Sequence, residues 1–224
     1  MPGLLCLQGG RELTPDCREL DALVLDRVAD PVVVLAGAAR RGQDYAGASA
    51  RAVSHYAALG AEVVAAPDPR DDGPACRAAL EQVGLLVLPG GSPGALREVL
   101  AGPVGERVVE LHYGGTAISG ASAGAMVLCE QLVVPDRSAA VTDGLALAPG
   151  LALPHWSLTS GPRWRIDVEP TWGLPECGGV IIDDGRIAAA GRGEPSVRLD
   201  GDWRPVPRGW TALDGLLAAS DAPG

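Results

Sequence analysis

A serine flanked by small residues follows an apolar run, where it could act as a nucleophile. Residues 116–128 read TAISGASAGAMVL, and the centre of this stretch is a G-x-S-x-G pattern with Ser122 in the middle. Small neighbours allow a sharp turn from strand to helix, which exposes the serine oxygen and aims backbone N–H groups at it. The pattern predicts a nucleophile elbow. In a chain with 31 glycines, the five residues alone also fit an ordinary tight turn.

A serine nucleophile needs a base, and the chain contains three histidines. His55 and His112 fall within helix-like stretches, where a histidine is more often a partly exposed or core residue. His155 lies in the segment Leu-Pro-His-Trp, outside the regular pattern. We therefore expect His155 to take the proton of Ser122.

The third group should be a carboxylate that orients the imidazole, since the chain has no asparagine that could replace it. Three acids lie between the serine and the histidine. Glu130 is expected on the helix that follows the serine, pointing away from the site. Asp136 is the preferred candidate, and Asp143 remains an alternative.

A second glycine-rich strand end, LPGGSPG at residues 88–94, could supply backbone N–H groups. In a parallel sheet, ligands bind at the carboxyl ends of the strands, where this loop and the serine would meet. We expect the N–H groups of Gly91 and Ala123 to hold an oxyanion and Gly90 to contact the substrate. A plain turn before a helix starting at Pro93 explains the loop equally well.

Short apolar runs alternate with amphipathic stretches up to residue 132, which predicts a parallel sheet covered by helices on both faces. The expected strands are residues 4–7, 32–36, 62–65, 85–88 and 116–119. The expected helices are residues 16–28, 45–59, 74–82, 93–100, 104–113 and 211–219. A hairpin of residues 179–182 and 186–190 predicts antiparallel strands near the C-terminus. We expect a mostly parallel three-layer α/β domain over residues 1–224, with 220–224 frayed.

The composition excludes several classes of function. The net charge of −10 and the pI of about 4.7 disfavour nucleic acid and anionic membrane surfaces as partners. All 18 basic residues are arginine, so Schiff-base lysine chemistry and a Ser-Lys dyad are absent. The histidines show no metal-ligand spacing, so we expect neither a metal nor another cofactor.

The five cysteines are scattered and odd in number, without a C-x-x-C pair. This pattern argues against a disulfide framework and predicts reduced thiols. The first residues lack the basic region and the long apolar run of a signal peptide, and no segment reaches the length of a membrane span. We therefore expect a cytoplasmic protein.

The sequence resembles the dipeptidase E and cyanophycinase family of serine peptidases over roughly residues 4 to 195. The resemblance is carried by several short segments in the family's order of serine, acid and histidine. They are Gly9-Gly10, Pro89-Gly90-Gly91 with Leu96, residues 118–125 around the serine, residues 144–147 with Pro149-Gly150, Pro154-His155, and Gly173-Leu174-Pro175-Glu176 before a strand and turn.

The resemblance implies a class I glutamine amidotransferase-like fold and cleavage of a peptide bond beside an aspartyl or isoaspartyl residue through an acyl-enzyme. A small peptide would be the substrate, and the protein would be a monomer or a homodimer. An arginine near the pocket would bind the substrate carboxylate. Arg163 and Arg165 are the candidates, with Arg40 and Arg41 as competitors.

Three other readings remain open. An α/β-hydrolase esterase shares the elbow, but its histidine normally follows the serine by more strand-helix units. A glutamine amidotransferase would need a cysteine nucleophile in place of Ser122. A binding module of the same fold without catalytic activity would show an unlocated acid and an altered glycine-rich loop, as this sequence does, but the presence of both Ser122 and His155 argues against it.

Overall fold

The computed structural model describes residues 1–29, 31–39, 42–135, 140–157 and 166–218. The described strands are β1 Leu5–Gln8, β2 Val32–Val34, β3 Val63–Ala65, β4 Leu85–Leu88, β5 Ala117–Ala121, β6 Cys129–Val134, β7 Ala140–Asp143, β8 Ala148–Leu153, β9 Thr171–Gly173, β10 Gly178–Asp183, β11 Arg186–Gly191, β12 Ser196–Leu199, β13 Asp202–Pro205 and β14 Thr211–Ala212. The helices are the 3-10 turn η1 Pro15–Cys17 and the α-helices α1 Arg18–Leu25, α2 Gln43–Ala57, α3 Gly73–Ala79, α4 Pro93–Leu100, α5 Pro103–Tyr113, α6 Ala123–Leu128 and α7 Leu213–Leu217.

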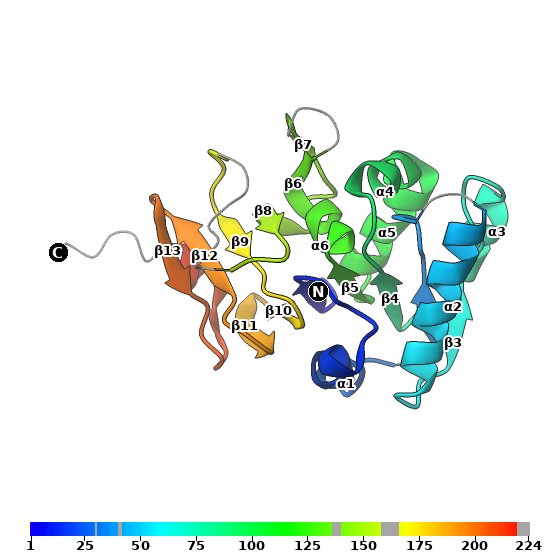
Figure 1. Ribbon diagram of the computed structural model, residues 1–224, viewed down its shortest axis with the longest axis horizontal. Coiled ribbons are helices and arrows are strands. Elements are labelled where there is room, and N and C mark those ends of the chain that lie inside the picture. The colour runs from blue at the N-terminus through cyan, green and yellow to red at the C-terminus, as the bar shows by residue number, and fades with distance from the viewer. Residues whose placement is uncertain (30, 40–41, 136–139, 158–165, 219–224) are drawn as a thin grey trace.

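The strands form two sheets (Figure 1). The larger has the order β14-β11-β10-β1-β5-β4-β2-β3, and the smaller has the order β13-β12-β9-β8-β6-β7. In the larger sheet, β1, β5, β4, β2 and β3 are all parallel. Beyond β1 the sheet continues with β10, β11 and β14, which pair antiparallel. The predicted α/β architecture is confirmed, and the separate smaller sheet was not foreseen.

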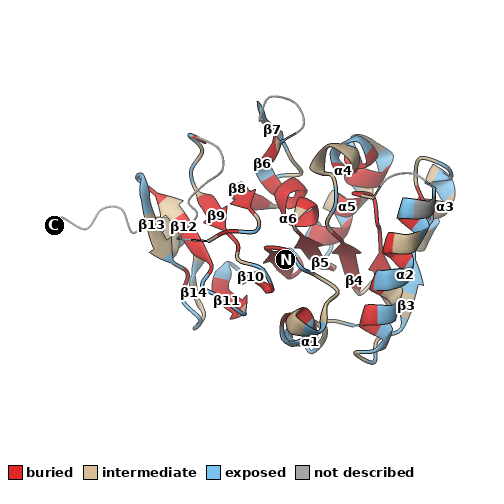
Figure 2. Ribbon diagram, viewed as in Figure 1, coloured by how far each residue is buried: buried red, intermediate tan, exposed pale blue. Residues whose placement is uncertain are grey.

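Successive residues of the central strands face opposite layers, as the alternation of a strand requires. Leu4 and Cys6 pack with residues of α1 and α2 in one apolar cluster. Leu5 and Leu7 belong to a larger cluster on the other side, which includes residues of α3 to α6 and of the smaller sheet. Figure 2 shows the buried residues concentrated in the central strands and in α6. Burial of this apolar surface stabilises the layers.

The C-terminal hairpin has the predicted location. β10 and β11 pair from Gly178 with Gly191 to Asp183 with Arg186. The two turn residues, Asp184 and Gly185, have φ of 47° and 68°. A two-residue turn with positive φ at both positions matches the right-handed twist of the strands, and Asp-Gly suits it.

Three predicted helix boundaries are wrong for identifiable reasons. Helix α1 begins at Arg18, because Pro15–Cys17 form a 3-10 turn directly before it, and the Asp16 side chain pairs with Arg192 at 2.7 Å. Helix α7 begins only at Leu213, because the preceding residues pair with β11. Helix α6 ends at Leu128 and passes directly into β6, so Glu130 lies on a strand, where its carboxylate accepts a hydrogen bond from the Gly150 N–H group.

His112 is buried near the end of α5, and burial lowers its pKa below the ordinary value of 6.5. The unfolded chain therefore binds a proton at His112 at a higher pH than the folded chain does. We expect the free energy of unfolding to fall as the pH drops below about 6.5. Urea unfolding at several pH values should show a smaller decrease for His112→Gln than for the wild type. An identical decrease for both proteins would contradict this assignment.

Candidate active site

Ser122 stands between β5 and α6 in a strained conformation, with φ of 50° and ψ of −110°. Its backbone N–H group donates to the carbonyl of Gln8 over 3.0 Å. A β-carbon at Gly124 would lie 2.0 Å from the carbonyl oxygen of Leu88, and one at Gly120 would lie 2.6 Å from the Gly124 backbone. Only glycine fits at both positions, so the small residues of the motif allow the turn that presents the serine.

His155 follows β8 and also has a positive φ, of 55°. Its Nε2 atom lies 3.1 Å from the Ser122 Oγ atom, a hydrogen-bond distance. The ring rests on Gly10, where a β-carbon would lie 2.3 Å from Cε1. Its side chain is 47% exposed. The geometry allows the imidazole to accept the serine proton.

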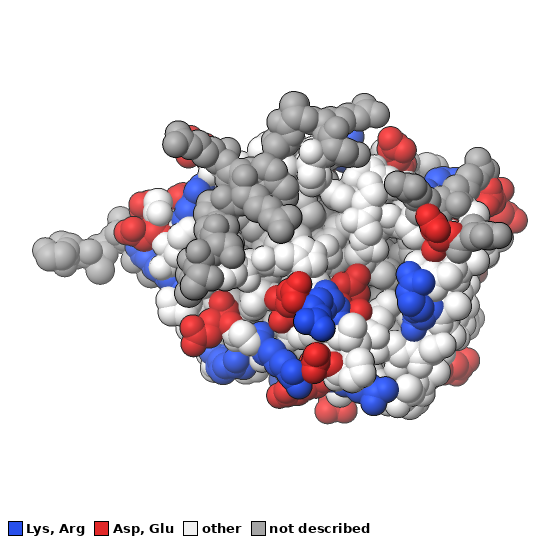
Figure 3. Space-filling model, viewed as in Figure 1, with Lys and Arg blue, Asp and Glu red and all other residues white. Residues whose placement is uncertain are grey.

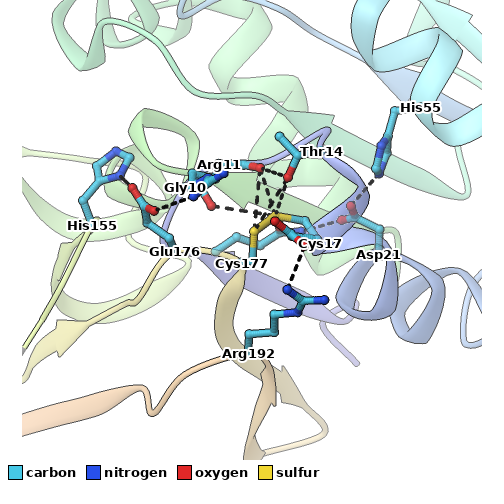
Figure 4. The surroundings of a disulfide bond; sticks show 12 residues. Gly10, Arg11, Thr14, Cys17, Asp21, His55, His155, Glu176, Cys177 and Arg192 are labelled. Atoms are coloured by element: carbon cyan, nitrogen blue, oxygen red, sulfur yellow. Dashed lines mark hydrogen bonds and ion pairs between the residues drawn. A yellow bond between two sulfur atoms is a disulfide. The ribbon is translucent and has the colours of Figure 1, made fainter.

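The carboxylate beside the imidazole belongs to Glu176. Its Oε1 atom lies 3.4 Å from the His155 Nδ1 atom, and its Oε2 atom lies 3.6 Å from the Arg11 guanidinium. Figure 4 shows the glutamate between the ring and Arg11. About half of the Glu176 side chain is exposed, so solvent weakens both ion pairs. A carboxylate in this position can orient the ring and stabilise its protonated form.

Glu176 follows both the serine and the histidine in the sequence, so it was not among the predicted acids. Asp136 lies outside the described residues. Asp143 is exposed on β7, and its backbone carbonyl accepts a hydrogen bond from Arg97. The signal that could have found Glu176 was the segment 173–176, which the family resemblance had already singled out.

Three consecutive carbonyls at the end of β1 hold the three segments of the site. The carbonyl of Gln8 accepts from the Ser122 N–H group, and that of Gly9 accepts from the His155 N–H group at 2.7 Å. The carbonyl of Gly10 accepts from the N–H group of Cys177, the neighbour of Glu176, at 2.9 Å. One short piece of backbone thus sets the distances between serine, histidine and glutamate.

Strained backbone conformations are concentrated around Ser122 and His155. Eight residues other than glycine have a positive φ in the described part of the chain. Five of them lie in or beside the site, namely Arg11, Leu13, Ser122, His155 and Cys177. Such conformations persist where the surrounding structure enforces them, and they cluster at functional sites.

A buried polar network supports the end of β1 from the side of α1 and α2. The Gln8 amide donates to the Asp21 carboxylate at 2.8 Å and to the Ser119 hydroxyl at 3.1 Å. Asp21 is also contacted by His55 Nε2 at 2.7 Å and by the Tyr56 hydroxyl at 3.1 Å. Burial and the charge of Asp21 raise the pKa of Tyr56 well above its ordinary value. His55 is thus a core histidine, which is one of the two roles predicted for it.

The glycine-rich loop after β4 lies beside Ser122, as a β-carbon on Gly90 would approach the Ser122 Cβ atom to 3.0 Å. The Gly90 N–H group donates to the Glu12 carboxylate at 2.7 Å. Among the described residues, the N–H groups of Gly91 and Ala123 have no hydrogen-bond partner. Arg163, Arg165, Arg40 and Arg41 lie outside the described residues.

A disulfide between Cys17 and Cys177 joins the segment after β1 to the segment that carries Glu176 (Figure 4). The expectation that all five thiols are reduced is therefore wrong. The two cysteines are 160 positions apart, and sequence spacing does not show that the fold brings them together. Cys6, Cys76 and Cys129 are free and buried. Because two of the five cysteines form a disulfide, reduced thiols no longer support the expected cytoplasmic location.

We expect this disulfide to stabilise the fold by about 2 to 5 kcal/mol, because it closes a long loop in the unfolded chain. The double variant Cys17→Ser/Cys177→Ser should unfold at a lower urea concentration than the wild type. A dithiol reductant should shift the wild type to the same midpoint and leave the double variant unchanged. Equal midpoints for oxidised wild type and double variant would contradict the expectation.

Charged side chains on the face shown in Figure 3 lie in small mixed groups of both signs. The described residues contain no group of three or more His, Cys, Asp or Glu side chains arranged to hold a metal ion. No helix in the described ranges is long and apolar enough to cross a membrane.

Comparison with known proteins gives structural likeness only. No protein-family model matches the chain, and no curated protein sequence matches it. The crystal structure of a peptidase from an acI-B1 Actinobacterium is similar, with a TM-score of 0.79 and 19% identity over 95% of this chain and 97% of that chain. A Listeria monocytogenes EGD-e protein that carries the provisional name Peptidase E has a TM-score of 0.58 and 14% identity, over 86% of this chain and 100% of that chain. At these identities the likeness shows a shared fold.

Proposed function

We propose that the protein is a serine peptidase that forms an acyl-enzyme on Ser122. The observation that carries the proposal is the 3.1 Å contact between Ser122 Oγ and His155 Nε2 at a strained turn from strand to helix. The similar structures, one of a peptidase and one provisionally named Peptidase E, support the choice of a peptide substrate.

In the proposed cycle, His155 takes the proton of Ser122 as its oxygen attacks the carbonyl carbon of the scissile bond. Glu176 holds the ring by its Nδ1 atom and stabilises the protonated form. The backbone N–H groups of Gly91 and Ala123 stabilise the negative charge on the carbonyl oxygen. His155 then gives its proton to the leaving amine, and water hydrolyses the acyl-enzyme by the same steps.

Aspartyl and isoaspartyl peptides are the first substrates to test, because of the resemblance to dipeptidase E and cyanophycinase. Purified protein should be incubated with Asp-X, isoaspartyl and unrelated dipeptides, with His155→Ala as the control.

A serine-directed fluorophosphonate should label the wild type and fail to label Ser122→Ala. No labelling of the wild type would favour a binding module of the same fold. Release of a carboxylic acid from simple esters, with all peptides left intact, would favour an esterase.

A further inference from the structure

Glu12 places a carboxylate beside the nucleophile, and the proposed cycle assigns it no role. Its Oε1 atom accepts the Gly90 N–H group at 2.7 Å. A β-carbon built on Gly90 would lie 2.5 Å from this Oε1 atom and 3.0 Å from the Ser122 Cβ atom. The Glu12 carboxylate and the Ser122 Cβ atom thus both border the small space beside Gly90.

The charge of this carboxylate has no counter-ion among the described residues. The hydrogen-bond partner of Glu12 is a neutral backbone N–H group, and its neighbour Arg11 pairs with Glu176 instead. Glu12 is partly buried, which weakens the screening of its charge by solvent. A negative charge here opposes the oxyanion that would form at Ser122, unless a bound substrate brings a positive charge.

The backbone around Glu12 is fixed. Arg11 and Leu13, on either side of it, have φ of 54° and 63°. The Thr14 hydroxyl donates to the Arg11 carbonyl at 2.8 Å, and the disulfide at Cys17 anchors the end of this segment. The position of the carboxylate is therefore built into the fold, as expected for a group that binds a ligand.

We infer that Glu12 selects the substrate of the proposed peptidase by binding the protonated α-amino group of the residue whose carbonyl Ser122 attacks. This inference rests on the proposed function. A cation that reaches Glu12 while the carbonyl carbon contacts Ser122 must lie close to that carbon, and the α-nitrogen is only two bonds away. An N-acylated residue would bring a neutral amide, whose oxygen the carboxylate repels.

The test compares amino-acid p-nitroanilides with a free α-amino group against the same compounds after N-acetylation. Alanine, leucine and aspartate derivatives should be used at about pH 7, where the amine is protonated. We expect the wild type to favour the free amine by about 10- to 100-fold in kcat/KM, the range for a hydrogen bond to a charged group. In Glu12→Gln the preference should fall to a few-fold, through a higher KM for the free amine.

Glu12→Gln is a suitable variant because its amide oxygen can still accept the Gly90 N–H group. Exposed Glu19 on α1 supplies the control, since Glu19→Gln removes the same charge away from the site. N-acetyl-lysine p-nitroanilide tests whether a cationic side chain is recognised instead. Its cleavage in preference to the free amines would overturn the inference, as would an unchanged preference in Glu12→Gln.

Fluorophosphonate labelling distinguishes a failure of the proposed peptidase activity from a failure of the proposed role of Glu12. If Ser122 is labelled but the wild type favours the N-acetylated compounds, or cleaves none of the free amines, only the role of Glu12 is refuted. If neither labelling nor cleavage occurs, the peptidase is refuted and the inference with it. Labelling of Glu12→Gln at least as fast as that of the wild type would show that the substitution left the nucleophile intact.

Discussion

Replacing Ser122 with alanine is expected to lower kcat by more than about 1,000-fold, because no other group can form the acyl-enzyme. Alanine differs from serine only by the missing oxygen, so packing around the elbow should be kept. The measurement is the rate at which the best substrate of the peptide screen is cleaved, beside a urea unfolding curve of each protein.

The unfolding midpoints of wild type and Ser122→Ala should agree, which ties the loss to chemistry. Activity of the variant within about tenfold of the wild type would refute Ser122 as the nucleophile, since a covalent step cannot survive its removal. A large drop in the midpoint would instead mark a structural role for the hydroxyl.

Replacing Glu176 with glutamine is expected to lower kcat by about 100-fold and to leave KM within a few-fold. The amide keeps the size of the side chain but cannot stabilise the protonated imidazole, and it can hold the ring in the wrong tautomer. The effect should be smaller than for a fully buried carboxylate, because Glu176 is 48% exposed. Steady-state kinetics on the same substrate provide the measurement.

Asp136→Asn and Asp143→Asn are the matched controls, because they neutralise the two carboxylates that the sequence analysis predicted as candidates. Both should keep kcat within a few-fold of the wild type. Loss of activity in Asp136→Asn with full activity in Glu176→Gln would reverse the assignment. Equal losses in Glu176→Gln and Arg11→Ala would point to their ion pair as the feature that matters.

The parallel half of the fold could be predicted because most of its strands are short apolar runs bounded by glycine or proline. Residues 85–88 and 93–100 have the predicted bounds. The smaller sheet could not be predicted, because strands such as β9 and β12 are short and pair over distances that local patterns do not encode. The immediate change from α6 to β6 at Cys129 was missed because an apolar run fits a buried helix and a buried strand alike.

The sequence narrows the candidate residues where chemistry restricts the choice and cannot do so where geometry decides. A motif predicted Ser122, and elimination among three histidines predicted His155. The structure places the two side chains 3.1 Å apart. The chain contains 28 acidic residues, so elimination cannot select one of them. Glu176 lies near the site because β1 pairs with β10, and Glu12 does so because it contacts the loop after β4. Only the folded chain brings these segments together.

The three carbonyls of residues 8–10 make the length of the chain at this point as important as its side chains. Each active-site side chain can be exchanged separately, and each exchange leaves the other two in place. Insertion or deletion of a single residue between β1 and Glu12 would displace serine, histidine and glutamate from one another in one step. Natural variants of this protein should therefore carry substitutions in this segment far more often than insertions or deletions.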